Sequence, residues 1–180
     1  KIIVATNTND ILDRVFKTGI YRSDSVLKTL SPSMDIQVAS NFERLLFDLL
    51  NNDAKEVGKL MNELSKKGQF NLEKSILTRM SKDFDSGMVT DKDTITTINH
   101  FFNEKEITLC PHSAIGVRVA KEFVDTGETV VSLGTAHPAK FKDTVERALD
   151  TSISIPTGLQ NIMEKQESVR VIPASRQKVA

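Results

Sequence analysis

Residues Thr29 to Arg44 read TLSPSMDIQVASNFER, and this run is more informative about the fold than any other stretch of the chain. Its first half is a polar loop containing Pro32 that no packing of a core requires. Its second half enters a helix, because Ser40 and Glu43 have the spacing of a capping box. Since folds often build sites from a loop that an anchored helix delivers, we expect a functional loop here.

The helix that follows has a clear apolar stripe. Its members recur at the spacing i, i+3, i+4 and i+7, and they are Phe42, Leu45, Leu46 and Leu49. This pattern predicts an amphipathic helix that packs one face on a core and runs to about Leu50.

Strand and helix signals alternate along the chain, which favours an α/β fold. The segments that read as strands are 2–5, 107–109, 129–133 and 169–172. The segments that read as helices are 11–16 (stopped by Gly19), 54–67 and 72–82 (broken near Gly68), 90–102 (with a second capping box from Thr90 to Asp93), 111–120, 141–149 and 159–164. We find no repeat and no linker, so residues 1–180 are expected to form a single domain with helices on both faces of its sheet.

Composition excludes several classes of function. The 24 basic and 24 acidic residues cancel, so charge favours neither nucleic acid nor an acidic membrane as a partner. A long apolar span and a signal-peptide pattern are both missing, which makes the cytoplasm the expected location. The single Cys110 cannot form an internal disulfide, and the histidines lack ligand spacing, so no metal site is expected.

Ligands of parallel α/β sheets collect at the carboxyl ends of strands, which draws attention to three loops. They are residues 6–9, 110–113 and 134–140. In the third loop, Thr135 could form one hydrogen bond and His137 and Lys140 could hold an anion, although a helix start with a solvated lysine fits equally well. For the first loop, asparagines that cap the next helix are the simpler interpretation.

Four runs closely resemble the threonine synthase family: VATNTNDIL from Val4, TLSPSMDIQVASNFERLLFDLL from Thr29, CPHSAIGVRVA from Cys110 and SLGTAHPAKF from Ser132. The resemblance implies the pyridoxal-phosphate fold type II, a partial three-layer arrangement here, also called the tryptophan-synthase-β type. It implies a lyase that converts O-phosphohomoserine and water to threonine and phosphate by β,γ-replacement.

The resemblance also suggests roles for individual residues. A neutral hydroxyl holds the ring nitrogen of the cofactor in such enzymes, and Thr135 is our candidate, with Ser132 as the alternative. His112 and Ser113 would lie beside the ring. Many relatives read DPHT where this chain reads CPHS, so a carboxylate role at Cys110 is doubtful.

On the substrate side, the resemblance suggests six residues from the two signature loops and the helix after the first. They are His137, Lys140, Ser31, Ser33, Asn41 and Arg44.

No catalytic residue is expected within the chain, because the family's aldimine lysine and its glycine-rich phosphate loop belong to the amino-terminal half.

The chain therefore resembles the carboxyl-terminal portion of a larger enzyme, and a strand that starts at Lys1 agrees with this. We expect it to need the remainder of its own polypeptide, to be inactive and to hold no cofactor alone, and to self-associate through exposed sheet edges. Two alternatives remain open: a free-standing binding or regulatory module without the lysine, and an unrelated α/β enzyme that uses His137 and Lys140 on an anionic substrate.

Overall fold

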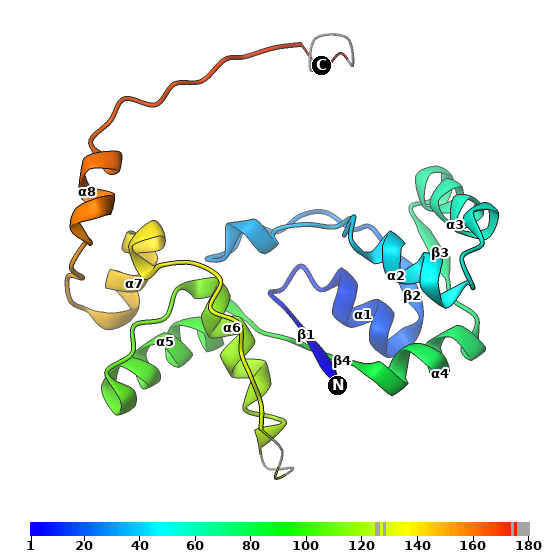
Figure 1. Cartoon of the computed structure of the whole chain (residues 1–180), viewed down its shortest axis with the longest axis horizontal. Coiled ribbons are helices and arrows are strands. Elements are labelled where there is room, and N and C mark those ends of the chain that lie inside the picture. Colours follow the sequence, from blue (N-terminus) through cyan, green and yellow to red (C-terminus); the bar gives the residue numbers. More distant parts are fainter. Residues whose placement is uncertain (125–126, 128, 174, 176–180) are drawn as a thin grey trace.

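The computed structural model of the chain describes residues 1–124, 127, 129–173 and 175, and its fold is mixed α/β (Figure 1). The strands are β1 (Ile2–Thr6), β2 (Ile20–Arg22), β3 (Gln69–Asn71) and β4 (Phe84–Met88). The α-helices are α1 (Ile11–Thr18), α2 (Phe42–Leu49), α3 (Ala54–Lys67), α4 (Lys74–Asp83), α5 (Asp91–Lys105), α6 (Pro111–Ala120), α7 (Lys142–Leu149) and α8 (Thr157–Met163). The 3₁₀ helices among the described residues are η1 (Pro32–Met34) and η3 (Pro138–Phe141).

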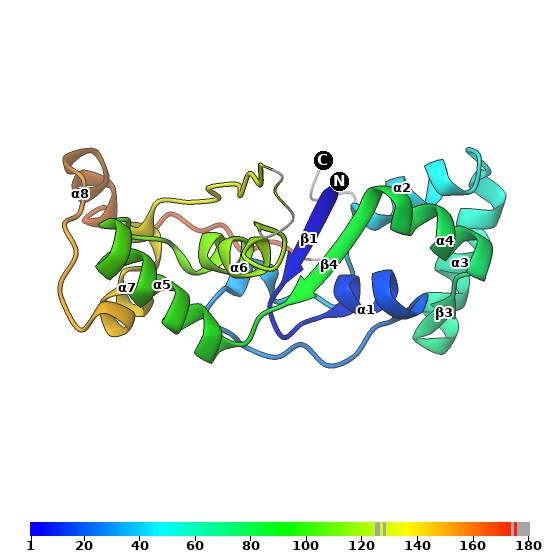
Figure 2. The same cartoon turned by 90° about the horizontal axis from the view of Figure 1, so that it is seen from below.

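A parallel pair of strands, β1 and β4, lies at the centre with a helix on each face (Figure 2). The register pairs Ile2 with Phe84 and continues to the pair of Thr6 and Met88. Because side chains alternate along a strand, neighbouring residues of β4 meet different helices. Ser86 donates a hydrogen bond to the carbonyl of Asp13 on α1 at 3.5 Å, whereas Gly87 lies against Val119 of α6. The expected three-layer arrangement with helices on both faces is therefore confirmed.

A second pair of strands, β2 and β3, is antiparallel and belongs to the amino-terminal part of the chain. Tyr21 of β2 stacks on Phe70 of β3 and on Phe42 of α2, with ring centroids 4.9 and 5.0 Å apart. Its hydroxyl accepts a hydrogen bond from the backbone N–H of Ala39 at 2.8 Å. The predicted apolar stripe of α2 packs into this core, since Phe42, Leu46 and Leu49 are buried.

A separate apolar cluster holds α5, α6 and α7 together around the buried residues Ile98, Ala114 and Val145. Figure 2 shows these helices to one side of the central strands, with α6 next to them. Proline at the first turn of α6 pre-sets the helical φ and needs no N–H there, so the start predicted at Pro111 is confirmed.

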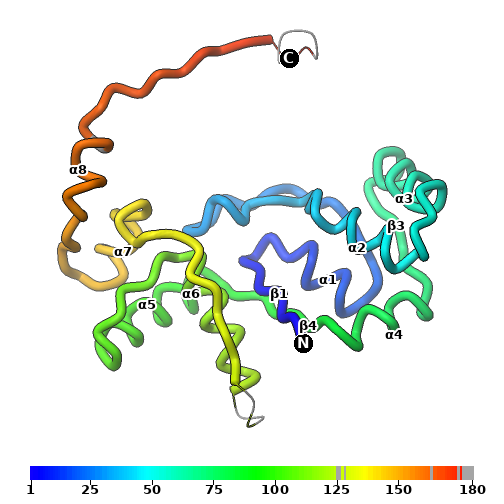
Figure 3. The backbone as a smooth tube through the Cα atoms, in the orientation of Figure 1, coloured from blue at the N-terminus to red at the C-terminus, as the bar shows by residue number. Residues whose placement is uncertain are grey.

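Three of the four predicted strands are wrong. Among the described residues, the segments 107–109, 129–133 and 169–172 form no ladder, and only the strand at 2–5 is found. An apolar run becomes a strand only where another strand can pair with it, and these runs have no such neighbour in the described chain. Val131 and Val171 are accordingly 79% and 90% exposed. The segment beyond α8 runs away from the other elements (Figure 3).

Helix ends depart from the predictions at some places and agree at others. The capping box of Ser40 and Glu43 is wrong, because the residue before α2 is Asn41 and no side chain caps it. Backbone carbonyls do this work instead, as Ala39 accepts the N–H of Phe42 at 3.0 Å. At α5, the Thr90 hydroxyl accepts the N–H of Asp93 as predicted.

The predicted helix stops are also found. Gly19 and Gly68 end α1 and α3 in the left-handed conformation, with φ of 76° and 75°. None of the helices in the described part of the chain is long and apolar enough to cross a membrane.

Candidate functional site at the amino-terminal end of α6

A cavity of about 980 Å³ opens between β1, α6 and the extended segment 129–133. Several predicted site residues line it, namely Ser33, His112, Ser132 and Thr135. Its volume is at the upper end of the range of roughly 300–1,000 Å³ that is typical of small-molecule sites. Apolar side chains of β1 and α6, among them Ile3 and Val119, form its floor.

Two of the predicted cofactor residues are in direct contact. The Ser113 and Thr135 hydroxyl oxygens lie 3.1 Å apart, and the backbone N–H of Thr135 donates to the Ser113 oxygen at 3.0 Å. Ser113 is buried and Thr135 is exposed, so Ser113 anchors the loop while Thr135 stays accessible. The structure therefore brings together two loops that are more than twenty residues apart in the sequence.

Cys110 completes this cluster. Its sulfur lies 3.2 Å from the Ser113 hydroxyl and 3.5 Å from that of Thr135, and it accepts the N–H of Ser113 at the start of α6. Burial raises the pKa of the Cys110 thiol, but hydrogen bonds from Ser113, Thr135 and the backbone at Ala136 outweigh burial and leave the pKa below its usual value. Cys110 is thus a buried residue and at the same time a polar member of the cluster.

His112 connects the cluster of Cys110, Ser113 and Thr135 to the loop of Thr29 to Asp35. Its Nε2 accepts a hydrogen bond from the backbone N–H of Ser33 at 3.2 Å, and its ring lies 4.5 Å from that of Phe141 at 46°. Burial lowers the pKa of His112, the charge of Lys140 lowers it further, and Asp35 acts in the opposite direction. The imidazole is therefore held in its neutral form.

The turn after β1 also holds the loop of Thr29 to Asp35 in place. The buried Asn7 amide nitrogen lies 2.8, 2.9 and 2.8 Å from the Thr29 hydroxyl, the Ser31 hydroxyl and the Asp35 carboxylate, which share its two N–H groups. Asn9 donates to the same carboxylate at 3.0 Å. The expectation that these asparagines cap the next helix is wrong, since no side chain caps α1. They hold the loop of Thr29 to Asp35 in place instead.

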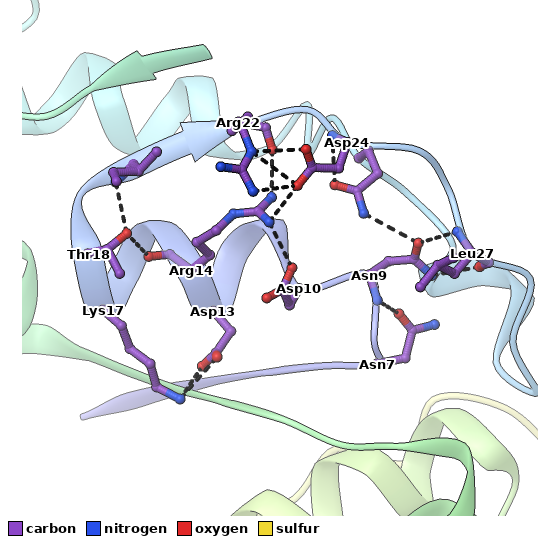
Figure 4. Close-up of polar contacts among 12 residues, drawn as sticks. Asn7, Asn9, Asp10, Asp13, Arg14, Lys17, Thr18, Arg22, Asp24 and Leu27 are labelled. Atoms are coloured by element: carbon purple, nitrogen blue, oxygen red, sulfur yellow. Dashed lines mark hydrogen bonds and ion pairs between the residues drawn. The ribbon is translucent and has the colours of Figure 1, made fainter. Parts of the chain in front are cut away.

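Figure 4 shows how this turn continues into α1. The side-chain oxygen of Asn7 accepts the backbone N–H of Asn9, and Asn9 exchanges hydrogen bonds with the backbone of Leu27. Farther along, Arg14 bridges Asp10 at 3.2 Å and Asp24 at 2.7 Å. These contacts fix the turn of residues 7–10, which in turn supports the loop of Thr29 to Asp35.

His137 and Lys140 lie near the cavity but do not line it. His137 uses its Nδ1 to accept the N–H of Ala139 at the start of η3, and the Lys140 ammonium sits 5.6 Å from the centre of the Phe141 ring. The charge of Lys140 nevertheless contributes to the lowered pKa of His112.

The remaining substrate candidates are dispersed. Ser31 is buried and bonded to Asn7, so it supports the loop from within. Asn41 lines a second hollow, of about 380 Å³, together with Val4 and residues of α1, on the other face of β1. Arg44 is exposed on α2 and does not line the cavity.

Sequence reasoning missed the structural parts played by Asn7, Asn9 and Asp35. A useful signal was present, because two asparagines directly after a buried strand are short of partners unless a second segment supplies them. Asp35, four residues after Ser31, is the acceptor that both asparagines share.

The chemistry of the cavity fits a pyridoxal-phosphate ring. A heteroaromatic nitrogen needs one hydrogen-bond partner, and the cavity offers the neutral hydroxyl of Thr135, which Ser113 holds in place. The apolar floor suits the face of the ring. Among the described residues, no group of three or more histidine, cysteine or acidic side chains could hold a metal ion.

Comparison with known proteins identifies the family of the chain. The family model "Threonine synthase, C-terminal" matches residues 113–180. The threonine synthase of Pseudomonas aeruginosa is 41% identical over 181 residues, which covers 99% of this chain and 39% of that relative.

Solved structures give the same result over nearly all of the chain. The crystal structure of pyridoxal-phosphate-bound threonine synthase from Brucella melitensis superposes with a TM-score of 0.85 and 39% identity, covering 99% of this chain and 39% of the other. The yeast enzyme gives a TM-score of 0.84 at 39% identity, covering 93% of this chain and 38% of the other.

The fold is thus that of part of a fold type II pyridoxal-phosphate protein. The chain is a threonine synthase homologue and covers roughly 40% of full-length threonine synthases, in their carboxyl-terminal portion.

Proposed function

We propose that this chain is the carboxyl-terminal portion of an enzyme that converts O-phosphohomoserine and water to threonine and phosphate with pyridoxal phosphate. The observation that carries the proposal is the superposition on the pyridoxal-phosphate-bound enzyme from Brucella melitensis across 99% of this chain. The cluster of Cys110, Ser113 and Thr135 also supports it, because it presents a neutral hydroxyl at the cavity.

When bound, pyridoxal phosphate supplies the electron sink for such a reaction. Thr135 is the residue that we assign to its ring nitrogen, and Ser132 on the cavity wall is the alternative. A hydroxyl is neutral, so it leaves the nitrogen less protonated than a carboxylate would. Ser113 positions Thr135, and His112 lies against the side of the same cavity.

The substrate is a phosphate ester with an amino-acid end, so it brings negative charge to the site. Ser33 lines the cavity and can donate or accept a hydrogen bond there. Lys140 and His137 lie beside it, and the Lys140 charge favours an anion in that region. We assign these three residues to the substrate side.

The 180-residue chain is expected to be inactive alone, because no lysine within it occupies the family's cofactor-lysine context. The test is to purify the chain and the natural gene product that contains it, and to measure threonine and phosphate release from O-phosphohomoserine with added cofactor. We expect both products in equal amounts from the natural gene product and none from the chain. If the natural gene product releases neither, a binding or regulatory role gains support.

A further inference from the structure

We propose that His112 is a positioning residue whose unprotonated Nε2 holds the loop of Ser31 to Asp35 against the cavity. Its importance for catalysis rests on the function proposed above, whereas the contact itself does not. The backbone N–H of Ser33 donates a hydrogen bond to this Nε2 at 3.2 Å.

That bond fixes the protonation of the ring. A neutral imidazole carries one proton and can accept at only one nitrogen, so acceptance at Nε2 places the proton on Nδ1. Nδ1 is buried and finds no hydrogen-bond partner among the described residues. With 7% of its surface exposed and Phe141 packed 4.5 Å away, His112 keeps this orientation.

The loop needs a contact at this point because its other anchors lie on either side of it. Asn7 holds Ser31 and Asp35 at the two ends of the loop. Between these ends, Ser33 and Met34 line the cavity. The bond from Ser33 to His112 therefore sets how the middle of the loop faces a ligand.

Burial and nearby charge keep this contact intact near neutral pH. Burial is the larger cause that lowers the pKa of His112, Lys140 on η3 lowers it further, and Asp35 on the loop acts in the opposite direction. A proton added to Nε2 would point at the N–H of Ser33, donor against donor, and would break the bond. Acidification is thus expected to release the middle of the loop.

Two substitutions separate this role from a general effect on packing. In His112→Gln, an amide oxygen can occupy the place of Nε2 and accept the Ser33 N–H. In His112→Asn, the shorter side chain cannot reach it. His100→Asn is the matched control, because His100 is exposed on α5.

The experiment measures amide hydrogen exchange over residues 31–35 in the natural gene product, with KM for O-phosphohomoserine alongside. We expect exchange at Ser33 to rise about tenfold in His112→Asn, to recover largely in His112→Gln and to stay unchanged in His100→Asn. We expect KM to follow the same order, with kcat less affected.

The possible results are distinct. Equal exchange in all variants overturns the proposed contact, whatever the kinetics show. Altered exchange with unchanged KM overturns its role in the reaction. If the wild-type protein does not act on O-phosphohomoserine, the proposed function fails, and the exchange data still decide whether His112 holds the loop.

Discussion

The hydroxyl oxygen of Thr135 lies 3.1 Å from that of Ser113, and the backbone N–H of Thr135 donates to the same Ser113 oxygen at 3.0 Å. One buried serine therefore fixes both the backbone and the side chain of the residue after Gly134. This pairing converts an exposed loop into a defined donor and acceptor at the cavity.

Replacing Thr135 with valine removes this hydroxyl while keeping the shape of the side chain. If Thr135 meets the cofactor nitrogen, Thr135→Val in the natural gene product should change the absorbance spectrum of the bound cofactor and lower turnover at least about tenfold. Thr135→Ser retains the hydroxyl and is expected to lie close to wild type. An unchanged spectrum and rate in the valine variant would mean that the assignment to Thr135 is wrong.

Replacing Ser113 with alanine should destabilise the loop itself. The Thr135 N–H then loses its acceptor, and Cys110 loses one hydroxyl partner. Because Thr135 is exposed and its N–H can turn to water, we expect the loss of this hydrogen bond to cost about 0.5–1.5 kcal/mol. Urea denaturation of the 180-residue chain measures this cost, and the exposed Ser25→Ala gives the baseline. Equal midpoints for the two variants would contradict the anchoring role of Ser113.

Gly87 tests the close contact between β4 and α6. A Cβ there would lie 2.9 Å and 3.0 Å from the two methyl carbons of Val119, a branched side chain that cannot easily turn away. Gly87→Ala is expected to lower the free energy of unfolding by about 1–3 kcal/mol.

Gly58, within α3, is the matched control, because a Cβ there meets nothing within 4 Å. Gly58→Ala should raise stability by about 0.5–1 kcal/mol through helix propensity. Denaturation midpoints that move in the same direction for Gly87→Ala and Gly58→Ala would contradict the contact.

A structural element can be predicted from the sequence where it depends on local residues, and less well where it depends on a distant partner. The helix stops at Gly19 and Gly68 were predicted, because they depend on one residue and its backbone. The strand β4 was missed, because its sequence FDSGM has little β propensity and the pairing with β1 makes it a strand. The strand predicted at 129–133 is the opposite case, because these residues favour a strand but form no ladder among the described residues.

The site shows the same division. The family motifs drew attention to His112, Ser113 and Thr135, which the structure brings together. Asn41 followed from its place in a signature run, yet it lies at the hollow on the other face of β1. Sequence proximity could not separate these two faces, because Ser33 and Asn41 belong to one continuous segment.

The pH dependence of stability should carry the signature of His112. The pKa of its folded form lies below the ordinary value of 6.5, mainly because of burial. The unfolded chain therefore binds a proton at higher pH than the folded chain does. As pH falls below about 6.5, the free energy of unfolding should decrease, and it should recover as pH rises. Urea denaturation between pH 7.5 and about pH 5 measures this slope, which should be smaller in His112→Gln. Equal slopes in both proteins would contradict it.

Self-association of the isolated 180-residue chain is the last expectation, and it follows from an incomplete sheet. In the described chain β1 pairs with β4 alone, and the segment 129–133 lies extended on the far side of the same cavity. The free edges of the β1–β4 pair can recruit a partner strand, and Leu133 in the neighbouring extended segment adds an apolar side chain that is 79% exposed. We expect light scattering to show a mass above that of one chain, rising with concentration. Leu133→Lys should reduce this association without loss of helical circular dichroism, because a charge beside the free strand edge opposes association and the exposed side chain packs on little. A monomeric mass for the wild-type chain at high concentration would rule out association through these edges.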